Sequence, residues 1–191
     1  MKKSILILGM LSILNMANCQ KTAYGIFKVK NDSTITMNGT IGGRTDNHFD
    51  KLHKKYPNIK WLELGDCPGS RNDEVNLKVA KTIHDLGLNI KLFSNSVIAS
   101  GAVDLFLAGI KREIEPGAKI GVHSRAGGGR KPTELPKEDP AHYLYIDFYK
   151  SVGKSDKEAT EFYFFTIQSA AANDIHWMTE AEIEFYKMRA N

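Results

Sequence analysis

The sequence predicts one α/β domain with a largely parallel sheet, followed by a helical C-terminal segment. In the first two-thirds of the chain, strand-like segments alternate with helix-like segments across short connections, which is typical of βαβ units. From residue 141 onward the apolar residues follow a helical period. The 191 residues are 42% hydrophobic and 25% charged, which suits a single globular core.

The first 19 residues have the layout of a secretory signal peptide. The basic pair Lys2 and Lys3 precedes an apolar run over 5–14, and a polar stretch with small residues ends at Cys19. The run is too short to cross a bilayer comfortably, because that takes about 20 apolar residues. A buried first helix or a membrane anchor is the alternative. We therefore expect an exported protein of the periplasm or cell envelope, with a single domain over 20–191.

Cys19 stands where a lipoprotein signal would carry its acylated cysteine, although Asn18 departs from the small residue usual before it. Lipidation of Cys19 and plain cleavage after it are both compatible with the sequence. In both cases the expected membrane attachment is limited to the signal or a lipid anchor. Cys67 would be the remaining cysteine, so no internal disulfide is expected.

The charge pattern excludes one class of partner. The formal charge is +4, or +2 without Lys2 and Lys3, and the basic residues are interleaved with acidic ones. We therefore expect no nucleic-acid partner. No pair of histidines has a convincing metal-ligand spacing, and we expect neither a metal nor a cofactor.

Each element follows from its local pattern. The helix after residue 70 has a broad apolar face and ends at Gly87, and the last helix begins at Thr179 with Glu182 completing a capping box. Strands are expected over 23–30, 34–39, 59–64, 90–93 and 118–123, and helices over 46–56, 99–108 and 154–171, with others beginning near 70, 141 and 179.

Ser100 lies where a strand gives way to a helix of small and apolar residues. Free N–H groups and the positive end of the helix dipole favour an oxyanion at such a position, and the small neighbours admit a substrate backbone. The sequence therefore makes Ser100 a candidate nucleophile. The alternative is a serine that merely caps the helix.

His123 ends a predicted strand, and ligands of open α/β sheets bind at strand ends. It is a candidate general base for a serine hydroxyl, with a surface histidine of no function as the alternative. The following segment, 124–140, is rich in Gly, Pro and charge. We expect it to form a loop beside the active site, either as a lid or as a disordered segment.

The turn over 66–70 directly follows a predicted strand. Its Pro68-Gly69 step would present backbone N–H groups outward, as an oxyanion hole requires, although an ordinary connecting turn is the alternative. The Cys67 thiol is a poor candidate nucleophile, because no separate base is evident beside it.

These pieces together resemble the proteolytic subunits of Clp proteases. The resemblance runs from about residue 34 to 186 and implies a ClpP/crotonase-like spiral of ββα units. The order and spacing of the matching segments agree, which is more specific than any one of them. Those segments are 61–70 (strand and turn), 98–109 (nucleophile helix), 121–124 (histidine strand) and 174–182 (closing segment with the acid).

The resemblance implies acyl transfer at a Ser-His-Asp triad. In it, Ser100 attacks a peptide carbonyl, His123 accepts and returns the proton, and Asp174 orients His123. The oxyanion hole would be formed by the backbone N–H groups of Gly101 and of Gly69 or Ser70.

Some residues depart from the family pattern. Ser70 replaces the second glycine of the turn, and Asp174 stands about one position early relative to the Trp177-Met178 pair. Segment 124–140 has no evident counterpart. Asp104 lies one helical turn after Ser100, where it could perturb the site electrostatically, although we favour a solvated or capping carboxylate.

The favoured hypothesis is an exported serine endopeptidase acting on a peptide or protein. The alternative is a non-catalytic binding or scaffold protein of the same fold with a degenerate triad. A crotonase-type acyl-CoA enzyme is disfavoured, because crotonases usually lack this triad and because an exported chain would not meet CoA substrates. A homo-oligomer is compatible with the family. We interpret the aromatic run over 162–165 as core rather than interface, and we expect no ATP-driven unfoldase partner.

Overall fold

The structure is a computed structural model that describes residues 22–126 and 129–191. The predicted signal peptide, with Cys19, lies outside the described residues. Within them, no helix is both long enough and apolar enough to span a membrane.

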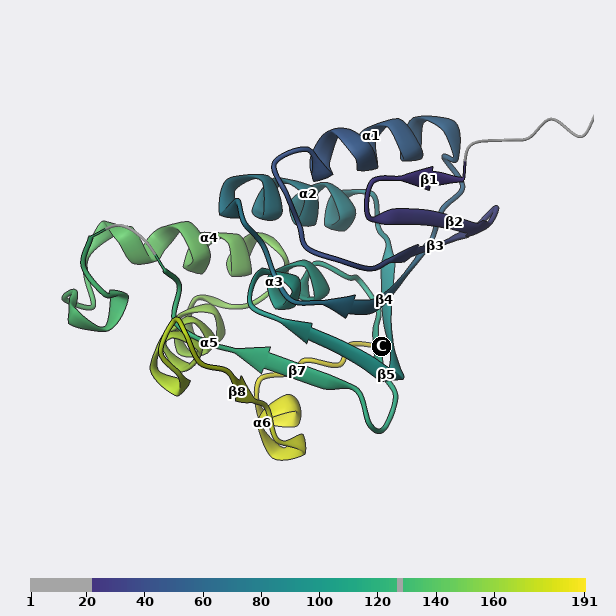
Figure 1. Cartoon of the computed structure of the whole chain (residues 1–191). Coiled ribbons are helices and arrows are strands. Elements are labelled where there is room, and N and C mark those ends of the chain that lie inside the picture. The colour runs from purple at the N-terminus through teal and green to yellow at the C-terminus, as the bar shows by residue number, and fades with distance from the viewer. Residues whose placement is uncertain (1–21, 127–128) are drawn as a thin grey trace, which may run out of the picture.

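A single eight-stranded sheet runs through the molecule (Figure 1). Its central strands β3, β4, β5 and β7 are parallel neighbours, whereas β1 and β2 at one edge and β8 at the other pair antiparallel. The short β6 also pairs with β5, in parallel. The predicted α/β fold with a largely parallel sheet is thus confirmed. The strands are β1 (Ala23–Tyr24), β2 (Phe27–Asn31), β3 (Thr34–Met37), β4 (Trp61–Cys67), β5 (Asn89–Ala99), β6 (Arg112–Ile114), β7 (Lys119–Val122) and β8 (His176–Trp177).

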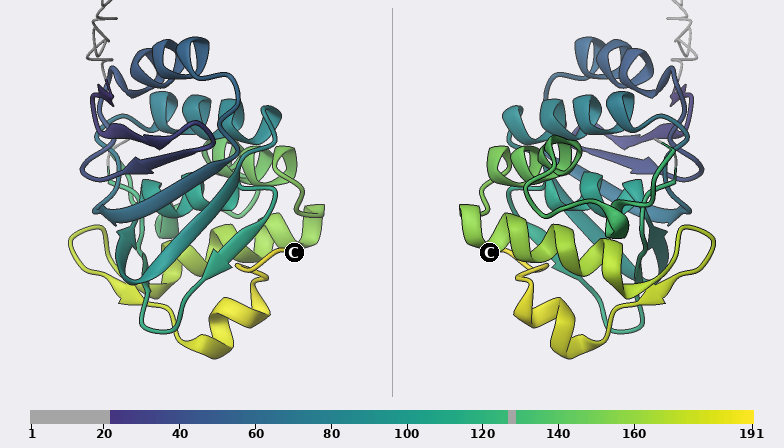
Figure 2. Two further views of the ribbon diagram at one scale, coloured as in Figure 1. Left: turned by 90° about the vertical axis from the view of Figure 1, so that its right-hand side faces the viewer. Right: turned by 90° about the vertical axis from the view of Figure 1, so that its left-hand side faces the viewer.

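The helices α1 to α5 lie on one side of this sheet, and α6 lies below its β8 edge, as the two views of Figure 2 show. Helix α3 packs between α2 and the strands β5 and β7, and α5 contacts both α4 and β7. The helices are α1 (Thr45–Lys55), α2 (Asp73–Asp85), α3 (Gly101–Leu107), α4 (Tyr143–Ser151), α5 (Asp156–Ser169) and α6 (Glu180–Phe185), with two 3-10 turns, η1 (Pro132–Glu134) and η2 (Pro140–His142).

The core lies between the sheet and the helices. Leu62 and Leu64 are fully buried and alternate with half-buried residues along β4, because one face of the strand packs against the helices. Every residue of α3 is buried, because this helix lies between other elements. Phe162 and Tyr163 of the aromatic run are also buried, and Phe164 and Phe165 pack against the same core. The run is therefore core, as predicted.

The main difference from the sequence prediction concerns β5. The strand was expected to end at residue 93, but it continues to Ala99, because its later residues pair with both β4 and β7 after a register shift in the ladder. Helix α3 consequently begins at Gly101 rather than at residue 99. Ser100 is thus the single residue between a long central strand and a buried helix.

The predicted loop over 124–140 carries the two 3-10 turns η1 and η2 rather than being wholly irregular. The short strands β6 and β8 were not predicted. Each has only two or three residues, too few for an alternating pattern to emerge.

Candidate active site

Ser100 adopts a backbone conformation that side chains rarely accept. Its φ is 54° and its ψ is −132°, in a region that only glycine enters without strain. Its backbone N–H donates to the Gly121 carbonyl of β7 (3.0 Å), and its carbonyl accepts from Val103 N–H (2.8 Å). These contacts fix the residue between strand and helix. The Ser100 hydroxyl makes no capping hydrogen bond, so the alternative of a simple helix cap is not supported.

The turn after β4 packs directly against Ser100. A Cβ atom added to Gly69, whose φ is +125°, would lie 2.8 Å from Ser100 Cβ and 3.3 Å from Ser100 Oγ. A Cβ added to Gly101 would lie 2.7 Å from Ser70 Cβ and 3.2 Å from the Ser70 backbone nitrogen. Glycine at both positions therefore permits the close approach of the two turns.

This packing brings the backbone N–H groups of Ser70 and Gly101 close to one another beside Ser100. In the described chain, neither the Ser70 N–H nor the Gly101 N–H donates a hydrogen bond to protein. The Gly69 N–H, in contrast, donates a hydrogen bond to the Cys67 thiol. Of the two turn residues proposed for an oxyanion hole, Ser70 thus has the available donor.

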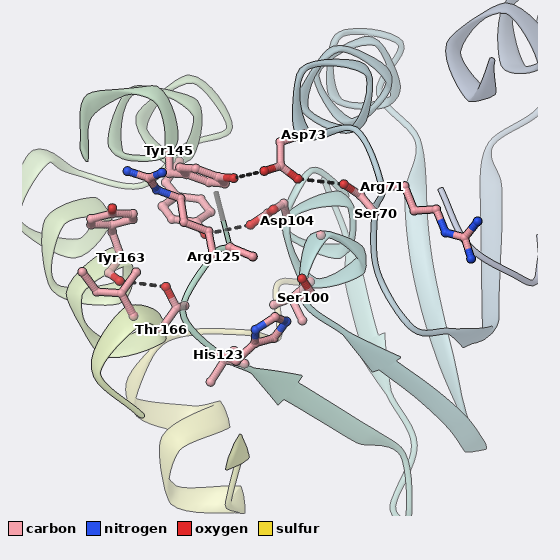
Figure 3. A pocket seen from close by; sticks show the side chains of 16 residues that line it. Ser70, Arg71, Asp73, Ser100, Asp104, His123, Arg125, Tyr145, Tyr163 and Thr166 are labelled. Atoms are coloured by element: carbon pink, nitrogen blue, oxygen red, sulfur yellow. Dashed lines mark hydrogen bonds between the residues drawn. The ribbon is translucent and has the colours of Figure 1, made fainter. Parts of the chain in front are cut away.

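Ser100 and His123 line the same cavity, which has a volume of about 300 Å³ (Figure 3). The walls come from the turn after β4, the start of α2, the start of α3, the end of β7, and helices α4 and α5. In Figure 3 the His123 ring lies next to the Ser100 hydroxyl. No hydrogen bond joins them in this conformation. Catalytic hydrogen bonds often tighten only when substrate is bound.

The His123 ring is held by the main chain. Its Nδ1 lies 2.8 Å from the carbonyl oxygen of Ser124, to which an Nδ1–H would donate. The Ser124 N–H in turn donates to the Ala170 carbonyl at the end of α5 (2.9 Å). This arrangement leaves Nε2 as the unprotonated nitrogen, which is the form a general base needs.

Asp174 does not join this group. It is exposed, its Oδ1 accepts the Ile175 N–H (2.8 Å), and it is not among the described residues that line the cavity. The antiparallel register of β7 with β8 brings the Asp174 backbone close to the end of β7, but the carboxylate is turned to its own main chain. The structure therefore brings together four of the sequence-derived residues, Ser100, His123, Ser70 and Gly101, without Asp174.

Asp104 differs from expectation. Instead of a solvated or capping carboxylate, it is a buried cavity residue, because α3 is covered on all sides. Its Oδ1 accepts the Tyr149 hydroxyl (2.7 Å) and its Oδ2 accepts Asn76 Nδ2 (3.3 Å). Burial raises the pKa of Asp104 from 3.8 to about 7, and the hydrogen bond from Tyr149 only partly opposes this.

A second carboxylate, Asp73, stands at the first residue of α2. Its Oδ1 accepts the Ser70 hydroxyl (2.8 Å) and its Oδ2 accepts the Tyr145 hydroxyl (2.7 Å). Ser70, which replaces a glycine of the family pattern, is therefore tied to the helix start. Tyr145 and Tyr149 of α4 were not identified from the sequence as site residues, because their spacing is that of an ordinary apolar helix face.

Cys67 is not a competing nucleophile. It is fully buried, and burial raises the pKa of its thiol to about 11. Within residues 22–126 and 129–191, no cluster of His, Cys, Asp or Glu could hold a metal ion.

Comparison with known proteins supports the fold. No protein-family model matches the chain, and no curated protein matches it in sequence. Among solved structures, a serine-to-alanine mutant of the 1510-N membrane-bound stomatin-specific protease is similar, with 18% identity and a TM-score of 0.52 over 82% of this chain and 76% of that one. A lysine-to-alanine mutant of the same protease, in complex with a substrate peptide, has 20% identity and a TM-score of 0.51 over 82% and 72%.

These similarities show a shared architecture. The mixed sheet with its helices is the ClpP-like serine protease fold, as the sequence resemblance predicted. At this level of identity the neighbours establish the fold alone.

Proposed function

We propose that this chain is an exported serine peptidase in which Ser100 is the nucleophile and His123 the general base. The observation that carries the proposal is the backbone of Ser100. A non-glycine residue at φ 54° and ψ −132° costs roughly 1–3 kcal/mol, and such strain concentrates at functional sites. A strained serine on a sharp strand-to-helix turn, with its hydroxyl unpaired in a cavity, is the arrangement of a nucleophile elbow.

The chemistry follows from the groups around Ser100. Its Oγ would attack the carbonyl carbon of a peptide bond, while its proton passes to His123 Nε2. The carbonyl oxygen then becomes an oxyanion, which the free N–H groups of Ser70 and Gly101 would stabilise. His123 returns the proton to the leaving amine, and an acyl ester on Ser100 remains. Water, deprotonated by His123, hydrolyses that ester and releases the free acid.

His123 needs an orienting partner, and two are available. The Ser124 carbonyl holds Nδ1–H in the present conformation. Asp174 would take that role only after its side chain turns away from the Ile175 N–H. We propose that the Ser124 carbonyl orients His123 in the present conformation. Asp174 would take over this role only in a rearranged, substrate-bound triad.

Export and envelope localisation are part of the proposal. They rest on the basic, apolar and small-residue layout of 1–19. Lipidation at Cys19 and plain cleavage remain the two outcomes to separate. Mass spectrometry of the mature N-terminus decides between an acylated Cys19 and a free Gln20.

A fluorophosphonate probe tests the nucleophile. Wild type should be labelled, Ser100→Ala should not, and Ser94→Ala, which alters an exposed serine of β5, should label like wild type. His123→Gln should slow labelling about 100-fold or more, since a general base contributes at least that much. An unlabelled wild type, under conditions where a control hydrolase reacts, would contradict peptidase activity. If Asp174→Asn slows labelling as much as His123→Gln, the acid rather than the carbonyl orients the base.

The position of Asp174 also favours a second candidate, a non-catalytic binding or scaffold protein of this fold. Its carboxylate lies off the cavity, so a complete triad is not assembled. In this case the cavity would bind a peptide without cleaving it. Measurable peptide binding by wild type, together with absent probe labelling and absent cleavage, would establish this alternative.

A further inference from the structure

Arg125 carries a positive charge into the cavity without a carboxylate partner. It stands two residues after His123, is half-buried and lines the cavity. Its Nη2 reaches the Ala141 carbonyl at a long 3.3 Å, and its Nε is buried with no hydrogen-bond partner. Two other arginines of the described chain pair with acids, Arg130 with Asp139 and Arg189 with Glu180. A buried guanidinium donor left unpaired is unfavourable, so its presence calls for a ligand.

The acidic residues of the cavity cannot serve as that partner. Asp73 already accepts two hydroxyl groups, and Asp104 accepts the Tyr149 hydroxyl and an amide. Neither forms an ion pair with Arg125. Among the described residues, the Arg125 guanidinium therefore has no carboxylate partner in the cavity.

The guanidinium is aimed inward. In Figure 3 the Arg125 side chain extends from the end of β7 toward Tyr145, whereas Arg71, the other arginine at the cavity, points away from it. Arg125 also acts on Tyr163. Burial raises the pKa of the Tyr163 hydroxyl, and hydrogen bonding to Arg125 opposes that rise. Tyr145 and Tyr163 thus both lie near the charged group.

We propose that Arg125 is a specificity-determining residue that binds a carboxylate of the substrate in the cavity beside Ser100. The inference deepens the proposed peptidase function and rests on it. A planar guanidinium with free donors matches a carboxylate in geometry and charge. Because Arg125 follows His123 on the same strand end, a carboxylate held there belongs to a residue next to the bond that Ser100 would attack. A cavity of about 300 Å³ is at the small end for ligand sites and suits one side chain with its adjoining backbone.

The carboxylate could come from an acidic side chain or from the C-terminus of a peptide. Two matched pairs of small ligands separate these sources. N-acetyl-glutamate amide and N-acetyl-glutamine amide differ only in the side-chain group. N-acetyl-alanine and N-acetyl-alanine amide differ only in the terminal group. Binding is measured by NMR titration on the full chain and on Ser100→Ala, so that the result does not depend on turnover.

We expect the acid of at least one pair to bind about tenfold or more tightly than its amide, as a charge-assisted hydrogen bond predicts. The pair that shows the preference identifies the source. Arg125→Met should abolish the preference and Arg125→Lys should restore part of it, because lysine keeps the charge but not the planar donors. Arg44→Met, which removes an exposed arginine outside the cavity, should leave it intact. Thermal unfolding of each variant confirms that it is folded.

Equal binding of acid and amide in both pairs would overturn the proposal. A preference that survives in folded Arg125→Met or in folded Arg125→Gln would overturn it as well, and so would the absence of measurable binding by all four ligands. Failure of the peptidase proposal has a different signature. In that case Ser100 remains unlabelled by fluorophosphonate while the acid preference, and its loss in Arg125→Met, persist.

Discussion

Replacing Asp104 with asparagine should change how the stability of the fold depends on pH. In the native state the Asp104 carboxylate is buried, with Tyr149 and Asn76 as its hydrogen-bond partners. Asparagine has nearly the same shape. Its oxygen can still accept the Tyr149 hydroxyl, which makes the shorter of the two hydrogen bonds (2.7 Å against 3.3 Å). The substitution therefore removes an ionisable group and leaves the packing in place.

The size of the effect follows from the pKa. Burial raises the folded-state pKa of Asp104 from 3.8 to about 7, so the ionised form disfavours the folded state. No stability is lost below about pH 4, loss accumulates as the pH rises from there to about 7, and the effect is constant above. Since each pH unit between the two pKa values is worth ~1.4 kcal/mol, wild type should lose up to about 4 kcal/mol across this range.

Urea unfolding at several pH values between 4 and 8 measures this loss. The free energy of unfolding of Asp104→Asn, relative to wild type, should rise steadily between pH 4 and pH 7 and then level off. Asp147→Asn is the control, because that carboxylate lies exposed on α4. If the difference between Asp104→Asn and wild type did not change with pH, the raised pKa of Asp104 would be refuted.

Three further outcomes are expected. Gly69→Ala should destabilise the fold and slow fluorophosphonate labelling, because the new Cβ would lie 2.8 Å from Ser100 Cβ. Gly42→Ala is the control, since its Cβ would meet no atom within 4 Å, and equal melting temperatures for the two variants would contradict the prediction. Glu158→Gln should reduce stability at neutral pH but not near pH 2. The ion pair with Lys187 and hydrogen bonds lower the pKa of Glu158 from 4.5 to about 2, and the stabilisation that they provide disappears as the pH falls through this range. A loss of stability that persists unchanged at pH 2 would argue against this account. Cys67 should resist iodoacetamide at pH 8 in the folded protein and react after unfolding, because burial raises its thiol pKa to about 11; rapid alkylation of the native chain would show that the thiol is accessible.

The central strands and helices were predictable because each is long enough to show its own period. The boundary at Ser100 was not, since the end of β5 depends on pairing with β7, a segment about 20 residues later. Local propensity predicted a helix start at residue 99, whereas in the structure the pairing of β5 with β7 extends the strand and the helix begins at Gly101. The short β8 was missed for a related reason, as its two residues are a strand only because β7 lies beside them.

The candidate site divides in the same way. Ser100, His123 and the Gly69 turn stand at element junctions, where sequence signals are strongest. The tyrosines of α4 and the buried Asp104 have helical spacing, which looks identical whether the side chains meet solvent, core or cavity. Arg125 had no signal, because only the packing of α4 and α5 around it makes its charge unusual.

The backbone at Ser100 has a consequence for how this chain can change by mutation. Glycine would accept φ 54° without penalty, so Ser100→Gly should give a more stable protein than Ser100→Ala, which retains the strain and lacks the hydroxyl. Selection for folding alone would thus push this position toward glycine. We therefore expect serine to persist at this junction where its hydroxyl is used, and glycine to replace it where the chemistry has been lost.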